Sequence, residues 1–414
     1  MKSLTLCRSC GAQLAQTVAD LGLSPVSNAF VKPEHAAKGE MFYPLHALVC
    51  QTCWLVQLSD TDASDAATHF HDEYVYFSSF SSSWLEHARR YVAAMSTRFQ
   101  LSGRSKVMEL ASNDGYLLQY FVKAGVPCVG IEPSANTAAA ARNKGVDSRE
   151  IFFNSNTAAA LAQEGWQVDL LLGNNVLAHV PDINDFIQAM PTVLKPDGVI
   201  TLEFPHLLKL MSENQFDTLY HEHYSYLSLT ALLPIFARAG LRVFDIEHLP
   251  THGGSLRVFA CKLTASHLAS ETVEQCLRQE QAAGLTQLAT YSAFGEKVRQ
   301  TKRALLAFLI SAKLEQRSIA AYGAAAKGNT LLNYCGIGCD FIEYVVDKNP
   351  LKQGRLLPGS RIPVCPPERI FETRPDYVLI LPWNIKSEVM EQMAGIRAWG
   401  GKFVVPIPSV EVLV

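Results

Sequence analysis

The 414-residue sequence lacks several features that would each place it in another class of protein. It contains no run of about 18 uninterrupted apolar residues, so no transmembrane helix is expected. Its first residues show no apolar core followed by a cleavage site, which argues against secretion. The formal net charge is only −3, and no excess of positive charge points to nucleic acid or to an anionic membrane. A soluble cytoplasmic protein is therefore expected.

Two common nucleotide-binding motifs are also missing. The turn at residues 111–115 reads ASNDG and does not match the GxGxxG pattern that wraps a dinucleotide pyrophosphate. The segment GAAAKG at residues 323–328 is not a P-loop, so nucleotide hydrolysis is not implied. A nicotinamide-dependent oxidoreductase stays open as an alternative, and the missing GxGxxG counts against it.

The length and composition favour a globular protein with two or three domains. Hydrophobic residues make up 48% of the chain and charged residues 18%, which is enough to build real cores. We predict a small module at residues 1–70, a second domain at residues 71–262 and a third at residues 263–414.

Four of the ten cysteines form two CxxC pairs separated by a long insertion, Cys7, Cys10, Cys50 and Cys53. In a reducing compartment this pattern indicates metal rather than disulfides. Four thiolates fill the tetrahedral coordination of zinc and leave no open position, so the metal is expected to be structural. A zinc ribbon that binds nucleic acid is the alternative, and the acidic balance of the chain counts against it.

The second domain begins with an α/β pattern. An apolar strand at residues 106–110 runs into a small-residue turn and a helix, as in the first βαβ unit of a doubly wound fold. The next strand, residues 128–132, ends in Glu132, where an acid can accept hydrogen bonds from both ribose hydroxyls of an adenosine. A later strand is expected at residues 199–205, after a helix turn at residues 195–198.

The densest cluster of acid, base and phenol groups is TLYHEHYSYLS at residues 218–228. A strand would place Tyr220 and Glu222 on the face opposite the two histidines, whereas a helix would bring Tyr220 and His223 together. One histidine is expected to act as a general base because its pKa near neutrality suits proton abstraction. Spacing alone allows either His221 or His223.

The last third of the chain shows a further βαβ pattern. A strand at residues 318–323 leads into AAAKGNT at residues 324–330, which opens a helix. Small residues, a helix N-terminus and Lys327 together suit the diphosphate of a nucleotide-sugar. Asp347 ends the next strand and could contact a ribose or base, and Trp383 and Asn384 could contact the base.

Segments along almost the whole chain resemble, in order, the sugar C-methyltransferases that act on nucleotide-linked 4-ketosugars. They are the four cysteines, DEYVYFSS, ELASNDGYLLQYF, GIEPS, GNNVLAHVPD, FDTLYHEHYSYLS, THGGSLRVF and AYGAAAKGNTLLNY. The resemblance implies a class I S-adenosylmethionine-dependent methyltransferase domain, a Rossmann-like C-terminal domain and an N-terminal zinc module. It also implies methylation of C3 beside the C4 ketone, with O- or N-methylation of a nucleotide-sugar as the alternative.

The resemblance also implies roles for particular residues. His223 would be the base, Tyr220 and Glu222 would position it or the sugar, His179 would be a second imidazole, Tyr74 would close the pocket, and His221 would be structural. The residues expected at the cofactor are Ala111, Asn113, Gly115, Tyr116, Leu117, Glu132, Pro133, Asn174 and Asn175. Those expected at the nucleotide-sugar are Tyr322, Gly323, Ala324, Lys327, Gly328, Asn329, Thr330, Asp347, Trp383 and Asn384. A monomer is plausible, because one chain supplies both ligand sites.

Overall fold

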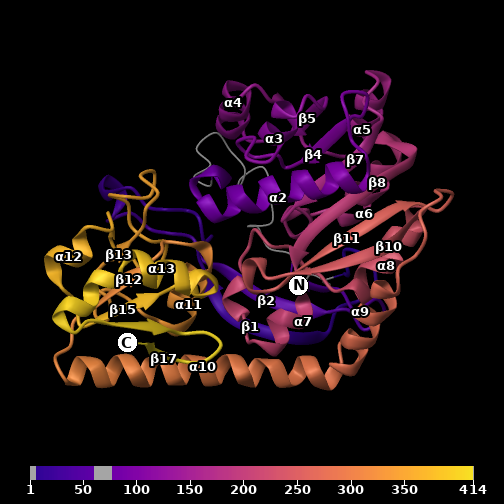
Figure 1. Ribbon diagram of the computed structural model, residues 1–414. Helices are drawn as coiled ribbons and strands as arrows, with labels where there is room; N and C mark the ends of the chain where they lie inside the picture. Colours follow the sequence, from indigo (N-terminus) through magenta and orange to yellow (C-terminus); the bar gives the residue numbers. More distant parts are fainter. Residues whose placement is uncertain (1–5, 60–76, 414) are drawn as a thin grey trace.

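Three sheets organise the chain in the computed structural model, which describes residues 6–59 and 77–413 (Figure 1). The largest sheet lies in the middle of the sequence, and a smaller one forms from the C-terminal third. A third, four-stranded sheet carries the N-terminal segment. Within the described residues, no helix is both long and apolar enough to cross a membrane.

The central sheet is doubly wound, as the sequence predicted. Its strand order is β10-β11-β8-β7-β4-β5-β6, with β4 to β8 parallel and with β11 antiparallel to both of its neighbours. The strands are β4 (Val107–Leu110), β5 (Cys128–Ile131), β6 (Asp147–Arg149), β7 (Val168–Asn174), β8 (Leu194–Pro205), β10 (Leu241–Leu249) and β11 (Ser255–Lys262). Because the order reverses between β4 and β7, their carboxyl ends border the crevice where such sheets bind ligands.

Helices cover both faces of this sheet (Figure 1). They are α2 (Ser82–Arg98), α3 (Leu118–Lys123), α4 (Ala135–Asn143), α5 (Ser155–Gln163), α6 (Ile183–Val193), α8 (Leu229–Arg238) and α9 (Glu271–Ala282). The short α7 (Leu207–Ser212) packs instead in the core shared by the N-terminal sheet and the C-terminal domain. The inner strands β4, β5 and β7 are almost entirely buried and form continuous, mostly apolar runs, whereas the edge strands β6 and β10 are partly exposed.

One boundary of the sheet differs from the expectation. The predicted helix turn at residues 195–198 belongs to β8, which begins at Leu194 directly after α6. The pairing with β7 passes from Leu194 to Val199, so the four polar and glycine residues between them bulge out of the ladder. A Pro and a Gly in this bulge imitate the signal of a turn.

The four-stranded sheet joins two segments that are far apart in the sequence. Its order is β1 (Gln16–Ser24), β2 (Tyr43–Val49), β3 (Val56–Leu58) and β9 (Ser225–Tyr226), all antiparallel. The short β9 lies within the cluster of histidines and tyrosines at residues 218–228, directly after Tyr224. Its pairing with β3 therefore fixes one end of that cluster to the N-terminal module.

The four predicted metal ligands come together beside this sheet. The sulfur atoms of Cys7, Cys10, Cys50 and Cys53 all lie within 4.8 Å of one another. Gln57 of β3 donates a hydrogen bond from Nε2 to Sγ of Cys7 (3.2 Å), which favours the thiolate form that binds metal. The cysteine cluster is thus bonded directly to the strand that pairs with β9.

The C-terminal third forms a six-stranded sheet of order β14-β13-β12-β15-β16-β17, in which only β17 is antiparallel. The strands are β12 (Ile319–Tyr322), β13 (Val345–Val346), β14 (Val364–Cys365), β15 (Tyr377–Ile380), β16 (Lys402–Val405) and β17 (Glu411–Leu413). The helices are α11 (Ala326–Cys335), α12 (Arg369–Thr373) and α13 (Lys386–Gln392). The long helix α10 (Leu288–Leu314) runs along this domain and packs against β1 (Figure 1).

Loss of the metal is expected to loosen the histidine cluster, because β9 pairs with β3 and β3 is bonded to the cysteine cluster. Chelation of zinc, or the variant Cys10→Ser, should raise amide hydrogen exchange at residues 218–228 as well as at residues 7–58. Exchange followed by mass spectrometry measures both. The exposed Cys339 lies outside the cluster, so Cys339→Ser is the matched control. Unchanged protection at residues 218–228 in a metal-free protein would contradict the coupling.

Candidate active site

One cavity of about 580 Å³ brings together residues predicted from distant parts of the sequence. It is lined by the carboxyl ends of the central strands, the histidine cluster and the start of α11. The predicted residues among its walls are Ala111, Asn113, Tyr116, Glu132, Pro133, Asn174, Asn175, His179, Tyr220, Glu222, His223, Lys327 and Asn384. A volume of this size suits small-molecule ligands.

Glu132 lies at one end of the cavity, at the tip of β5. Its carboxylate accepts backbone hydrogen bonds from Asn113 and Ser134, both at 2.9 Å. Burial raises the pKa of this carboxyl, and the two backbone donors act in the opposite direction. The acid is therefore fixed rigidly beside the loop after β4, with acceptor capacity left for a ligand hydroxyl.

The loop after β4 has an unusual backbone. Ala111, Asn113 and Gly115 all have positive φ angles, of 55°, 49° and 72°. A Cβ at Gly115 would lie only 3.1 Å from side-chain atoms of Ala141 and Val146, so this position requires glycine for space as well as for conformation. Gly115 and Leu117 thus shape the loop from behind and do not line the cavity among the described residues.

His223 is held by two hydrogen bonds. Its Nδ1 lies 3.0 Å from the carbonyl oxygen of Thr218, so Nδ1 carries a hydrogen and donates it. Its Nε2 lies 2.6 Å from the hydroxyl of Tyr220, which donates to the lone pair. A turn closed by the His223 amide and the Tyr220 carbonyl (2.8 Å) brings the two side chains together. Residues 220–223 form neither the strand nor the helix considered from the sequence. The contact between Tyr220 and His223 is nevertheless the i, i+3 contact that a helix would give.

His223 is held in its neutral form by its surroundings. Burial lowers its pKa well below the usual value, and the nearby His179, Lys327 and His252 lower it further. The rings of His179 and His223 meet edge to face, with centroids 4.6 Å apart. A neutral imidazole with its lone pair on Nε2 is the form required of a general base.

Glu222 lines the same cavity and is 2% exposed. Burial raises the pKa of its carboxyl to about 7, against the smaller effects of Asn28 and Lys352. Nδ2 of Asn28, from the N-terminal module, lies 2.8 Å from both carboxylate oxygens. By contrast, Nε2 of His221 donates to the carbonyl oxygen of Pro44 (3.2 Å), and His221 is not among the cavity residues.

The start of α11 closes the other end of the cavity. Ala325, Ala326 and Lys327 line it, and Nζ of Lys327 donates to Oδ1 of Asn384 (3.0 Å). Burial lowers the pKa of Lys327, while Asp217 raises it. The lysine therefore lies in a confined site where an anionic ligand would be strongly attracted.

Other residues predicted for the nucleotide-sugar have structural contacts instead. Thr330 donates to the carbonyl oxygen of Leu219 (2.9 Å), and Asn329 to that of Ser27 (2.6 Å). Trp383 does not line the cavity among the described residues, because its Nε1 donates to Asp217 (2.7 Å). Five further residues predicted for the nucleotide-sugar are not among the described residues that line the cavity, namely Tyr322, Gly323, Ala324, Gly328 and Asp347. Tyr74 lies outside the described residues.

Among the cavity residues that were not predicted from the sequence, four can contribute polar or aromatic contacts to a ligand, namely Asn28, Trp84, His252 and Lys352. His252 belongs to the THGG motif, which supported the resemblance but was given no role. Trp84 ends an aromatic and serine-rich segment that gave no further signal. Asn28 and Lys352 lie in segments without any recognisable pattern.

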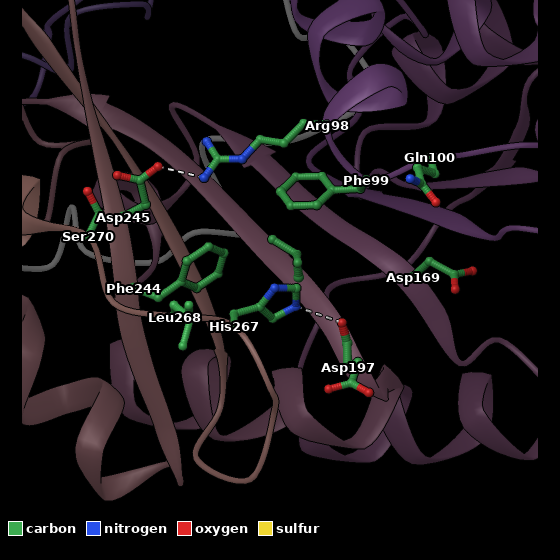
Figure 2. A pocket seen from close by; sticks show the side chains of 11 residues that line it. Arg98, Phe99, Gln100, Asp169, Asp197, Phe244, Asp245, His267, Leu268 and Ser270 are labelled. Atoms are coloured by element: carbon green, nitrogen blue, oxygen red, sulfur yellow. Dashed lines mark hydrogen bonds and ion pairs between the residues drawn. The ribbon is translucent and has the colours of Figure 1, made fainter.

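A second hollow of about 460 Å³ lies near the amino end of β7, away from the carboxyl edge of the sheet (Figure 2). Arg98 and Asp245 form an ion pair there, with an N–O distance of 2.6 Å. His267 stacks on Phe244 and donates from Nε2 to the carbonyl oxygen of Asp197 (2.9 Å). None of the predicted site residues lines this hollow, so we place the candidate site in the larger cavity.

Family models match three parts of the chain. Residues 7–66 match a model described as "Putative zinc binding domain", residues 84–246 a "Methyltransferase domain", and residues 250–408 a "C-methyltransferase C-terminal domain". The sequence is also 35% identical to "C-methyltransferase NovU" of Streptomyces niveus over 410 residues. This alignment covers 98% of this chain and 96% of that protein. The chain belongs to the C-methyltransferase family.

Two further similarities are confined to part of this C-methyltransferase. A "Ubiquinone biosynthesis O-methyltransferase" of Bartonella tribocorum is 31% identical over 96 residues, which are 23% of this chain and 39% of that protein. The structure of the PH0226 protein from Pyrococcus horikoshii is 16% identical. It covers 45% of this chain and 95% of that one, with a TM-score of 0.37.

The enzyme is a methyltransferase that uses S-adenosylmethionine, and its N-terminal module binds zinc through the four cysteines. The cavity fits the cofactor chemically. The amide oxygens of Asn174 and Asn175 are buried without a hydrogen-bond partner among the described residues. These two acceptors lie at the end of β7 and suit the ammonium and hydroxyl donors of the cofactor, while Glu132 suits its ribose.

The raised pKa of Glu222 gives a prediction about stability. Because its pKa in the folded protein is about 7 and the usual value is 4.5, the folded state binds more protons than the unfolded state between these pH values. This carboxyl therefore costs stability as the pH rises through that window. The unfolding free energy of Glu222→Gln, relative to that of the wild type, should therefore be about 1–3 kcal/mol higher at pH 8 than at pH 5.

Urea unfolding at both pH values measures this gain. The control is Glu391→Gln, on the exposed surface of α13, which should change the unfolding free energy equally at both pH values. A pH-independent effect of Glu222→Gln would show that the carboxyl is not held in its protonated form.

Proposed function

We propose that this enzyme methylates C3 of a nucleotide-linked 4-keto-deoxysugar, in the biosynthesis of branched deoxysugars. The observation that carries the proposal is the single cavity. At one end it has an acid suited to a ribose, and at the other a lysine beside a helix N-terminus. Between them lies a neutral imidazole whose Nε2 lone pair faces a tyrosine hydroxyl. This arrangement suits removal of a carbon-bound proton next to a second, anionic ligand.

In this proposal His223 is the base. A C4 ketone acidifies the proton on C3, and Nε2 of His223 accepts that proton as an enolate forms. Nδ1 stays bonded to Thr218 and stabilises the imidazolium through its carbonyl oxygen. Tyr220 must first turn its hydroxyl away from Nε2. Once turned, this hydroxyl can donate to the oxygen of C4 as negative charge develops there.

When bound, S-adenosylmethionine would supply the electrophilic methyl group for C3. Asn174, Asn175 and Glu132 would hold this cofactor at the carboxyl ends of the strands. His179 lies edge to face with His223 and would orient that ring and the sugar. Glu222, held by Asn28, would position the sugar, and Tyr74 is proposed to close the pocket.

The nucleotide would bind at the start of α11. The backbone there begins a ten-residue helix whose N-terminus favours an anion. Lys327 from α11 and Lys352 from a neighbouring loop both line the cavity and would neutralise a diphosphate. Asn384 is proposed to contact the base. We also propose domain boundaries at residues 70 and 262, a monomeric state and a cytoplasmic location.

The proposed reaction is tested with S-adenosylmethionine and a panel of nucleotide-linked 4-ketosugars carrying hydrogen, an amine or a hydroxyl at C3. The wild type should add one methyl to carbon 3, visible as a C–CH₃ signal by NMR. His223→Asn should lose at least about 100-fold in turnover, because general-base catalysis contributes roughly this much or more. It should also lose deuterium exchange at C3 while it still binds the cofactor.

His221→Asn is the matched control, since His221 lies two positions away but outside the cavity. It should retain deuterium exchange and turnover per folded molecule. Retained exchange in His223→Asn would assign the base to another residue. A methyl group on oxygen or nitrogen would refute C-methylation of the sugar.

A further inference from the structure

The THGG turn at residues 251–254 places a histidine in the cavity by means of a strained backbone. His252 has a φ angle of 53°, a conformation that non-glycine residues adopt rarely. The following Gly253 packs so closely against Trp383 that a Cβ would lie 2.6 Å from that ring. The turn is thus held from both sides, and His252 is directed at the cavity that it lines. The proposed base chemistry gives this residue no role.

His252 lies beside the cofactor end of the cavity. Its Nε2 is 2.9 Å from Nδ2 of Asn175, which donates to it. The indole of Trp84, from α2, meets the imidazole edge to face with ring centroids 5.2 Å apart. Tyr116 lies behind Trp84, with nearly parallel rings and centroids 6.0 Å apart. All four side chains line the cavity, so Trp84 and His252 present aromatic surface directly beside the floor of the cofactor site.

Lys327 is a cation in the same cavity, but the titratable groups of the aromatic surface itself are neutral or paired. Burial lowers the pKa of His252 to about 4, and Lys327 lowers it further, so its ring is neutral. The buried Glu203 accepts from Nε2 of His87 (2.9 Å) and from Arg257 (3.1 Å). The ring of His87 also stacks on the indole of Trp84, with ring centroids 4.7 Å apart. The wall therefore carries aromatic faces without a net positive charge of its own.

We propose that His252 and Trp84 form an aromatic wall that recognises the positive charge of the cofactor's sulfonium. Aromatic faces attract a cation, most strongly where water is excluded. The position is appropriate, because His252 and His223 line the same cavity and Asn175, just after β7, donates a hydrogen bond to His252. The methyl group must lie between those two residues if it is to reach a carbon deprotonated by His223.

The wall would favour S-adenosylmethionine, which is charged at sulfur, over the neutral product S-adenosylhomocysteine. This selectivity would help the product to leave after each turnover. The inference rests on the cofactor and not on the sugar substrate, so it can fail or succeed separately from the proposed reaction.

Isothermal titration of the full-length protein with each of the two ligands tests the wall. Trp84→Leu removes one aromatic face. His252→Gln removes the other but keeps a polar group near Asn175. Each variant should weaken binding of S-adenosylmethionine about tenfold more than binding of S-adenosylhomocysteine. Trp84→Phe and His252→Phe retain a ring and should keep the wild-type ratio of the two dissociation constants within about twofold.

Equal weakening of both ligands in Trp84→Leu and His252→Gln would overturn the proposal, because loss of packing alone acts on both ligands. A change of ratio as large in the two phenylalanine variants would also overturn it. Retained binding of S-adenosylhomocysteine shows in each case that the site is folded.

Discussion

The proposed catalytic turn depends on the hydrogen bond that Nδ1 of His223 donates to the carbonyl oxygen of Thr218. This bond decides which ring nitrogen keeps a lone pair, and it works only if the backbone of the turn is held still. The hold comes from outside the turn. Thr330 of α11 donates to the carbonyl oxygen of Leu219, and β9 is paired with β3 of the N-terminal sheet. The N-terminal sheet and the C-terminal domain thus both help to hold one turn of the central domain, and with it the tautomer of His223.

Burial makes the centre of the cavity a place where few groups carry charge. The pKa of Glu222 is raised to about 7 and those of His223 and His252 are lowered, and Asp217, next to the cavity residue Thr218, has a pKa raised to about 6. Desolvation is the largest cause in all four. The proposed reaction between a carbanion and a sulfonium would remove two opposite charges, so a poorly solvating site would not disfavour its products.

The sequence predicted those parts of the site that depend on local pattern. The strand, turn and acid at Glu132, the CxxC pairs and the cluster around His223 all show their character within a few residues. It could not predict the contact between Asn28 and Glu222, which are 194 positions apart and share no periodicity. The place of His252 also depends on tertiary packing, because only the folded chain brings the THGG turn to the end of β7.

The shared ladder of β3 and β9 has a consequence for how such enzymes can be recombined. Val56 and Gln57 pair with Tyr226 and Ser225, so the N-terminal sheet is completed by residues encoded far downstream. A crossover that exchanged only the first 70 residues between two relatives would pair β3 of one protein with β9 of the other. Chimeras, and lineages that shuffle these modules, should therefore inherit the first segment and the histidine-rich turn as a unit.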